Sequence, residues 1–255
     1  MKTTLRLLAA AAAAAVLGVT PAFAVIGGAP DGDAHPYVGM SVFFDSHGNS
    51  LWRCSGFLVS PTVYVTAGHC AGAEFPGAPQ PAKAAIWFGS GPISHSTPPD
   101  VVGTPVADPA WNGNLPDHDI GIVRLATPVT DRGYATLAPT GYLDGLATSR
   151  GTQDVSFTIV GYGVEDYGPN GLTAVPLRSS GTVQLERLTS DALYTTASNG
   201  NGTGGSATCL GDSGGPVFNG GYVVALVSGG TKYCNGKAAD FRVDTTEAQD
   251  FVAAG

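Results

Sequence analysis

Charged residues are scarce in this 255-residue chain, and basic residues are the scarcer kind. Lys and Arg number 12 against 20 Asp and Glu, and together the four make up 13% of the chain. This acidic balance lacks the basic surface that nucleic acids and anionic membranes attract, so we expect neither as a partner. What is plentiful is Gly (37), Pro (18) and hydrophobic residues (43%), which is typical of a globular protein built from short strands and turns.

The first 24 residues hold the only apolar run that is conspicuously long, and we interpret them as a secretory signal peptide. Lys2 and Arg6 give a basic start, an uncharged Ala/Leu/Val stretch follows, and Ala-Phe-Ala forms a cleavage site before Val25. The run is too short and wrongly flanked for a retained membrane anchor. We therefore expect a secreted protein with a mature net charge of about −10; the Ala-rich leader favours a bacterial source.

Cysteine is also rare. A secreted chain with four cysteines is expected to form two disulfides, but spacing alone leaves three possible pairings open. Metal ligation is the competing interpretation, and the absence of any Cys-x-x-Cys spacing disfavours it. We expect neither a metal nor a cofactor.

Residues 209–216 (CLGDSGGP) place Ser213 in a glycine-rich turn. Small neighbours let a substrate carbonyl approach a serine nucleophile, and backbone N–H groups can converge on the oxyanion. Gly-x-Ser-x-Gly also occurs in the α/β-hydrolase elbow, but there a helix follows and the histidine comes after the serine. Here Pro216 follows closely, and no histidine occurs after His118. The base must therefore lie upstream.

A base and its orienting carboxylate are both found upstream. His69 ends the alternating apolar run VTAGHC, and Asp119 opens the strand-like segment DIGIVRL. Asp117, two residues earlier, is the competing carboxylate. The order His, Asp, Ser is one of three known chain orders of this triad.

With these three motifs the chain resembles the chymotrypsin/trypsin-like serine protease family over nearly its whole length after residue 24. The resemblance implies a hydrolase, a serine endopeptidase that acts on proteins or peptides. It implies an all-β fold of two six-stranded antiparallel β-barrels with a short C-terminal helix. The first barrel (25–135) would carry His69 and Asp119, and the second (136–255) would carry Ser213 and the specificity pocket.

The residue pattern fits that architecture. Strand-like segments fall into two sets on either side of a linker at 127–141, and a Thr-capped helix is predicted at 245–254. The expected strands are residues 37–44, 52–59, 63–66, 84–88, 101–106 and 120–125, then 155–162, 178–188, 193–196, 216–218, 222–227 and 240–243. Residues 165–174 and 197–207 are predicted to be loops.

The resemblance also assigns contacts. It pairs Cys54 with Cys70 and Cys209 with Cys234. It implies that the N–H groups of Gly211 and Ser213 form the oxyanion hole. It also implies that Ser228 donates a hydrogen bond to Asp119.

In the family, a free amine at the chain start pairs with the carboxylate before the nucleophile, here Asp212. The start Val25-Ile26-Gly27-Gly28 is similar to the family's Ile-Val-Gly-Gly. No propeptide separates Ala24 from Val25, so we expect signal peptidase itself to free this amine. The alternative is that Asp212 only caps the turn.

Specificity follows less directly. The resemblance places Ala207, followed by Thr208, at the base of the primary pocket, and Gly230 and Ala238 along its walls. This predicts an open apolar pocket for aromatic or large aliphatic side chains. Gly229 stands where the family has a tryptophan, which would leave the next subsites without their hydrophobic wall.

Three alternatives stay open. An inward-facing Asp240 would restore a trypsin-like preference for Lys or Arg. The same triad could serve an esterase. A catalytically inactive homologue could act as a binding module, although such proteins usually lose a triad residue. We expect a monomer.

Overall fold

The computed structural model describes residues 25–75, 77–94, 96–146, 155–164, 166–168, 171–173, 175–197, 205–234 and 236–255. The predicted signal peptide lies outside these residues. Within the described ranges, no helix is long and apolar enough to cross a membrane.

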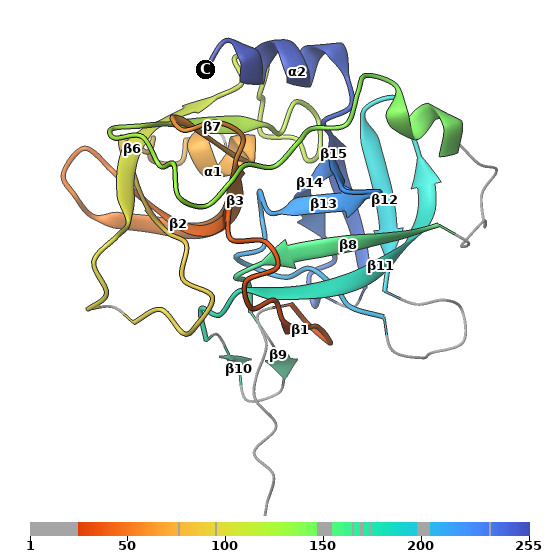
Figure 1. Cartoon of the computed structure of the whole chain (residues 1–255), viewed down its shortest axis with the longest axis horizontal. Helices are drawn as coiled ribbons and strands as arrows, with labels where there is room; N and C mark the ends of the chain where they lie inside the picture. The colour runs from red at the N-terminus through yellow and green to blue at the C-terminus, as the bar shows by residue number, and fades with distance from the viewer. Residues whose placement is uncertain are drawn as a thin grey trace, which may run out of the picture.

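The first half of the chain closes into a six-stranded antiparallel barrel, in orange to yellow-green in Figure 1. Its strands pair in the order β2-β3-β4-β7-β6-β5 and fill the interior with alternating apolar side chains. They are β2 (Val38–Phe44), β3 (Ser50–Leu58), β4 (Val63–Thr66), β5 (Lys83–Trp87), β6 (Val101–Ala107) and β7 (Gly121–Leu125). All six expected strands of this set are present.

The second half forms another antiparallel ring, in green to blue in Figure 1. β8 pairs with both β11 and β13, which closes the order β8-β11-β12-β15-β14-β13. The strands are β8 (Ser156–Gly161), β11 (Ser179–Leu188), β12 (Ala192–Thr196), β13 (Pro216–Asn219), β14 (Tyr222–Gly230) and β15 (Lys237–Arg242). The predicted fold class, two six-stranded barrels, is thereby confirmed.

The predicted C-terminal helix is α2 (Thr246–Ala253), in dark blue. Thr245 accepts a hydrogen bond from the Ala248 N–H, as an N-cap should. Ala248 and Val252 are buried against the first barrel, so α2 closes one end of the molecule.

Some elements differ from the expectation. The loop predicted at 165–174 contains a hairpin, β9 (Asp166–Gly168) with β10 (Gly171–Thr173). Strands β14 and β15 extend through Gly229, Gly230, Ala238 and Ala239, because a bulge after Leu226 restores their register. Glycine weakens the strand signal, so this extension was not expected from sequence. Two short helices, α1 (Gly68–Ala71) and η1 (Tyr142–Leu146), were also not predicted.

The first described residues lie against the second barrel. Strand β1 (Ala29–Pro30) pairs with β11, and Ile26 forms a bridge with Ala207. Next along the chain, Asp31 forms an ion pair with Arg178, both almost fully buried. Arg178 also donates to the carbonyls of Val38 and Phe88, so one guanidinium joins both barrels.

Each barrel carries one disulfide. Cys54 is bonded to Cys70 and Cys209 to Cys234, which confirms the pairing implied by the family resemblance.

Candidate active site

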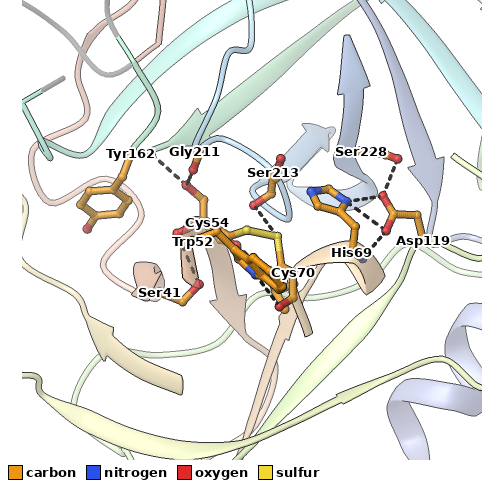
Figure 2. Close-up of a disulfide and its surroundings, with 12 residues drawn as sticks. Ser41, Trp52, Cys54, His69, Cys70, Asp119, Tyr162, Gly211, Ser213 and Ser228 are labelled. Carbon is orange, nitrogen blue, oxygen red and sulfur yellow. Dashed lines mark hydrogen bonds and ion pairs between the residues drawn. A yellow bond between two sulfur atoms is a disulfide. The ribbon is translucent and has the colours of Figure 1, made fainter. Parts of the chain in front are cut away.

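His69 and Asp119 meet at one edge of the first barrel, as predicted. The Asp119 Oδ2 lies 2.8 Å from His69 Nδ1, and Asp119 Oδ1 accepts the His69 backbone N–H at 2.7 Å. Asp119 is fully buried and accepts a further hydrogen bond from Ser228 Oγ at 2.5 Å. Figure 2 shows the carboxylate between His69 and Ser228, with Ser213 on the opposite side of the imidazole. Asp117 makes no contact with His69 in the described structure.

Short elements hold this pair in place. His69 lies on α1, where Gly68 is needed because a Cβ there would stand 3.1 Å from Asp119 Oδ1 and 3.0 Å from the Ile120 backbone. The disulfide at Cys70 ties this turn to β3. The backbone of the turn that carries His69 is therefore fixed relative to Asp119 and β3.

The site electrostatics favour a protonated imidazole. Burial by itself lowers the pKa of His69, but the charge and hydrogen bond of Asp119, together with the charge of Glu74, outweigh it and raise the pKa. Such an imidazole is a stronger base than free histidine and is stabilised when it takes up a proton.

The turn that carries Ser213 leaves two backbone donors free. The carbonyls of residues 209–213 all accept hydrogen bonds, in order from Asp212 N, Val164 N, Ser55 Oγ, Gly215 N and Ser55 N. The N–H groups of Gly211 and Ser213 have no acceptor among the described residues. Gly211 has φ +96°, a conformation that favours glycine. Two unpaired N–H groups beside a serine hydroxyl are what an oxyanion hole requires.

Asp212 is buried beneath this turn. It accepts hydrogen bonds from the N–H groups of Gly163 and Cys209, at 2.8 and 2.9 Å. Burial raises the pKa of Asp212 to about 7, only partly offset by these bonds and by the charge of Arg53. Val25 is also buried, but the described structure has no hydrogen bond or ion pair between it and Asp212.

One cleft holds His69 and Ser213 together with four of the predicted substrate-binding residues, Thr208, Ser228, Gly229 and Gly230. Ala207 does not line it but pairs with Ile26. Ala238 lines a neighbouring cleft that shares Gly229 and Gly230.

The cleft also contains side chains that the sequence did not reveal, namely Glu74, Leu115, Leu210 and Lys232. Leu115 corrects the expectation of a missing wall, because a Cβ placed on Gly229 would stand 3.1 Å from Leu115 Cδ1. A leucine from the loop before Asp119 thus covers the glycine that replaces tryptophan. No sequence signal marks it, since Leu115 lies in an irregular loop.

Asp240 lies deeper in the second barrel and is fully buried. Its Oδ2 accepts from the Thr195 hydroxyl, while Oδ1 has no partner in the structure described. Burial raises the pKa of Asp240 to about 7, against the opposing effect of hydrogen bonds from Thr195 and the Ser228 backbone.

Among the described residues, the close group of potential metal ligands is Cys54, His69 and Cys70. The two sulfurs are bonded to each other, so they are not thiolate ligands.

Comparison with known proteins agrees with this fold. The trypsin family model matches residues 26–252. A trypsin from Phaedon cochleariae is 27% identical over 205 residues, covering 78% of this chain and 77% of the relative. A brachyurin from Leptuca pugilator is 30% identical over 191 residues, covering 71% and 77%.

The solved structure of HL collagenase superposes with a TM-score of 0.67 and covers 90% of this chain and 97% of its own. At 15% identity this likeness shows the shared fold alone.

Proposed function

Since the chain belongs to the trypsin family and is a serine endopeptidase, we propose that Ser213, His69 and Asp119 are its catalytic triad. The observation that carries this proposal is that the His69 imidazole, bonded to Asp119, lies in one cleft with Ser213, whose turn leaves the N–H groups of Gly211 and Ser213 without an acceptor among the described residues. We extend the proposal to secretion, with cleavage before Val25.

In the first half-reaction, Ser213 Oγ bonds to the carbonyl carbon of the scissile peptide as its proton moves to His69 Nε2. The carbonyl electron pair becomes an oxyanion facing the Gly211 and Ser213 N–H groups, each worth about 3 kcal/mol in the transition state. The C–N bond then breaks as His69 gives its proton to the leaving amine.

In the second half-reaction, His69 takes a proton from water while the water oxygen attacks the acyl-enzyme carbonyl. The ester bond breaks, Ser213 recovers its proton, and the carboxylic acid product leaves. Asp119 holds the imidazole tautomer with Nδ1–H and stabilises the imidazolium, and Ser228 holds Asp119.

For the residue before the scissile bond we propose an apolar or aromatic side chain. The cleft beside Ser213 is lined in part by Val227, Gly229 and Gly230, which carry no charge, while Ala207, predicted at the pocket base, lies outside it and pairs with Ile26. The second candidate is a preference for Lys or Arg, favoured by the unpartnered Oδ1 of Asp240. Its raised pKa weighs against it, because a neutral carboxyl group attracts a cation poorly.

We further propose that the Val25 amine, once free, turns inward to Asp212. Both residues are buried, and a buried carboxylate without a cation is costly. The two disulfides fit an oxidising compartment. The ranges 1–24, 25–135 and 136–255, a monomeric state, a lack of nucleic-acid or membrane partners and a bacterial source remain predictions.

The test compares three proteins that all begin at Val25. They are the unaltered chain, its Ser213→Ala variant, and a Ser190→Ala variant that serves as the control because Ser190 is exposed. Peptide substrates differ only in the residue before the scissile bond. We expect cleavage after Phe, Tyr or Leu, unchanged in the control and reduced about 10⁴-fold or more by Ser213→Ala.

Cleavage after Lys or Arg would keep the triad and support the Asp240 candidate. Equal, negligible turnover by all three proteins would refute the triad proposal and support a binding module.

A further inference from the structure

Ser55 lies outside the triad, yet its polar atoms reach the nucleophile turn. It belongs to β3 of the first barrel, next to Cys54, and is fully buried. Its N–H donates to the Ser213 carbonyl at 2.8 Å, and its hydroxyl donates to the Gly211 carbonyl at 2.8 Å. The same hydroxyl accepts the Tyr162 N–H at 2.9 Å. In Figure 2 the dashed lines from Gly211 and Tyr162 meet at one oxygen, close to the Cys54–Cys70 disulfide.

We propose that Ser55 is a positioning residue that sets the oxyanion hole, acting through the Gly211 carbonyl. This proposal rests on the triad function proposed above.

The backbone dihedral angles of Gly211 are restricted by no side chain of its own. A glycine at φ +96° has no side chain to restrict its two dihedral angles, so its N–H keeps a fixed direction only if the neighbouring groups are held. Of the five carbonyls from residue 209 to residue 213, four are held by backbone N–H groups, and only that of Gly211 is held by a side chain. Among the hydrogen bonds to these five carbonyls, the one from the Ser55 hydroxyl is therefore the one that a side-chain substitution can remove.

Ser55 also links the turn that carries Ser213 to the turn that carries His69. The neighbour of Ser55, Cys54, is bonded to Cys70, which follows His69. Thr66, the last residue of the strand that leads to His69, donates to the Ser55 carbonyl at 2.8 Å. Ser55 thus fixes the oxyanion donors of the second barrel relative to the base of the first.

Ser55 packs closely against the backbone of two glycines. A Cβ added to Gly161 would stand 3.2 Å from Ser55 Oγ, and one added to Gly215 would stand 3.3 Å from Ser55 Cβ. Without the hydroxyl, a buried carbonyl and a buried N–H lose a partner, and the turn is expected to shift to recover hydrogen bonds.

The test compares Ser55→Ala with Ser41→Ala. Ser41 is equally buried in the same barrel, and its hydroxyl donates to the Cys54 carbonyl, at 3.3 Å, rather than to the Ser213 turn. Active-site titration restricts the rates to folded, competent molecules. Removal of one oxyanion donor lowers kcat about 10²–10³-fold, so we expect its misplacement in Ser55→Ala to lower kcat about tenfold, with KM within about twofold.

A matched inhibitor pair separates this role from a general loss of structure. A peptide aldehyde adds Ser213 Oγ to its carbonyl carbon, and the resulting oxyanion enters the hole; the corresponding peptide alcohol cannot react. We expect Ser55→Ala to weaken aldehyde binding about tenfold and leave alcohol binding unchanged.

Equal kcat in Ser55→Ala and Ser41→Ala, or equal weakening of aldehyde and alcohol binding, would each overturn the proposal. A wild-type enzyme that neither cleaves peptides nor binds the aldehyde would instead overturn the proposed function.

Discussion

Two carboxylates act on His69 from opposite environments. Asp119 is buried and bonded to the imidazole, whereas Glu74 is exposed at the rim of the cleft and acts only through its charge. Because His69 must be neutral to accept the Ser213 proton, whatever raises its pKa moves the onset of activity to higher pH.

The first prediction concerns Glu74→Gln. Removing this negative charge lowers the pKa of His69, so the acidic limb of the kcat/KM profile should move to lower pH, with the plateau unchanged. The measurement is a pH–rate profile at two salt concentrations, with Asp131→Asn as the control at an exposed loop position. A profile that moves equally in both variants would show a general charge effect rather than the action of Glu74.

The second prediction concerns Leu115, which covers Gly229 and is 51% exposed. Leu115→Ala should raise KM about tenfold for peptides with apolar residues on the amino side of the cleavage residue, because it removes about 1–2 kcal/mol of apolar contact. Single-residue substrates that do not reach this wall provide the reference. An equal change for long and short substrates would contradict the assignment.

At the scale of elements, α2 is tied to the first barrel by few groups. Thr245 caps its first turn, and His118 from the loop before Asp119 forms an ion pair with Glu247. Helices of this length are marginal alone, so the cap and the packing of Val252 determine whether α2 stays docked.

Thr245→Ala should therefore lower the free energy of unfolding by about 1 kcal/mol. Thr246→Ala is the matched control, since Thr246 is exposed and makes no cap bond. Urea unfolding in the Ser213→Ala background avoids self-digestion. Equal losses in both variants would mean that helix propensity, and not the cap, is responsible.

Elements with regular apolar alternation could be predicted from sequence, and those that depend on glycine could not. The strand leading to His69 carries clear apolar alternation, and it was placed correctly. The extension of β14 through Gly229 and Gly230 depends on pairing with a distant strand, which local composition does not encode. The three residues of the proposed triad could be singled out because their motifs are local, whereas Leu115 and Ser55 make their contacts between segments far apart in sequence.

At the scale of the molecule, two buried carboxylic acids bear on stability. Asp212 and Asp240 both have a pKa raised to about 7 by burial. The folded chain then binds these protons more tightly than the unfolded chain. This stabilisation is complete below about pH 4 and is lost as the pH rises through 7.

A free amine at Val25 should change this behaviour. We predict that a chain beginning at Ala22 loses up to about 4 kcal/mol of its free energy of unfolding between pH 4 and pH 7, because Asp212 gives up its proton over that range. Chain starting at Val25 should lose less, since its amine would favour the Asp212 carboxylate. Both carry the Ser213→Ala substitution, and the Asp240 contribution is common to both. Parallel pH curves for the two chains would refute the pairing of Val25 with Asp212.

The pairing of the chain start with the second barrel has a consequence for timing during synthesis. Ile26 and Ala29 are made early, yet their partners Ala207 and Ser180 are made more than a hundred residues later. The segment that holds Ile26 and Ala29 must therefore wait undocked while most of the chain is translated, and it can pair only once the second barrel has been made.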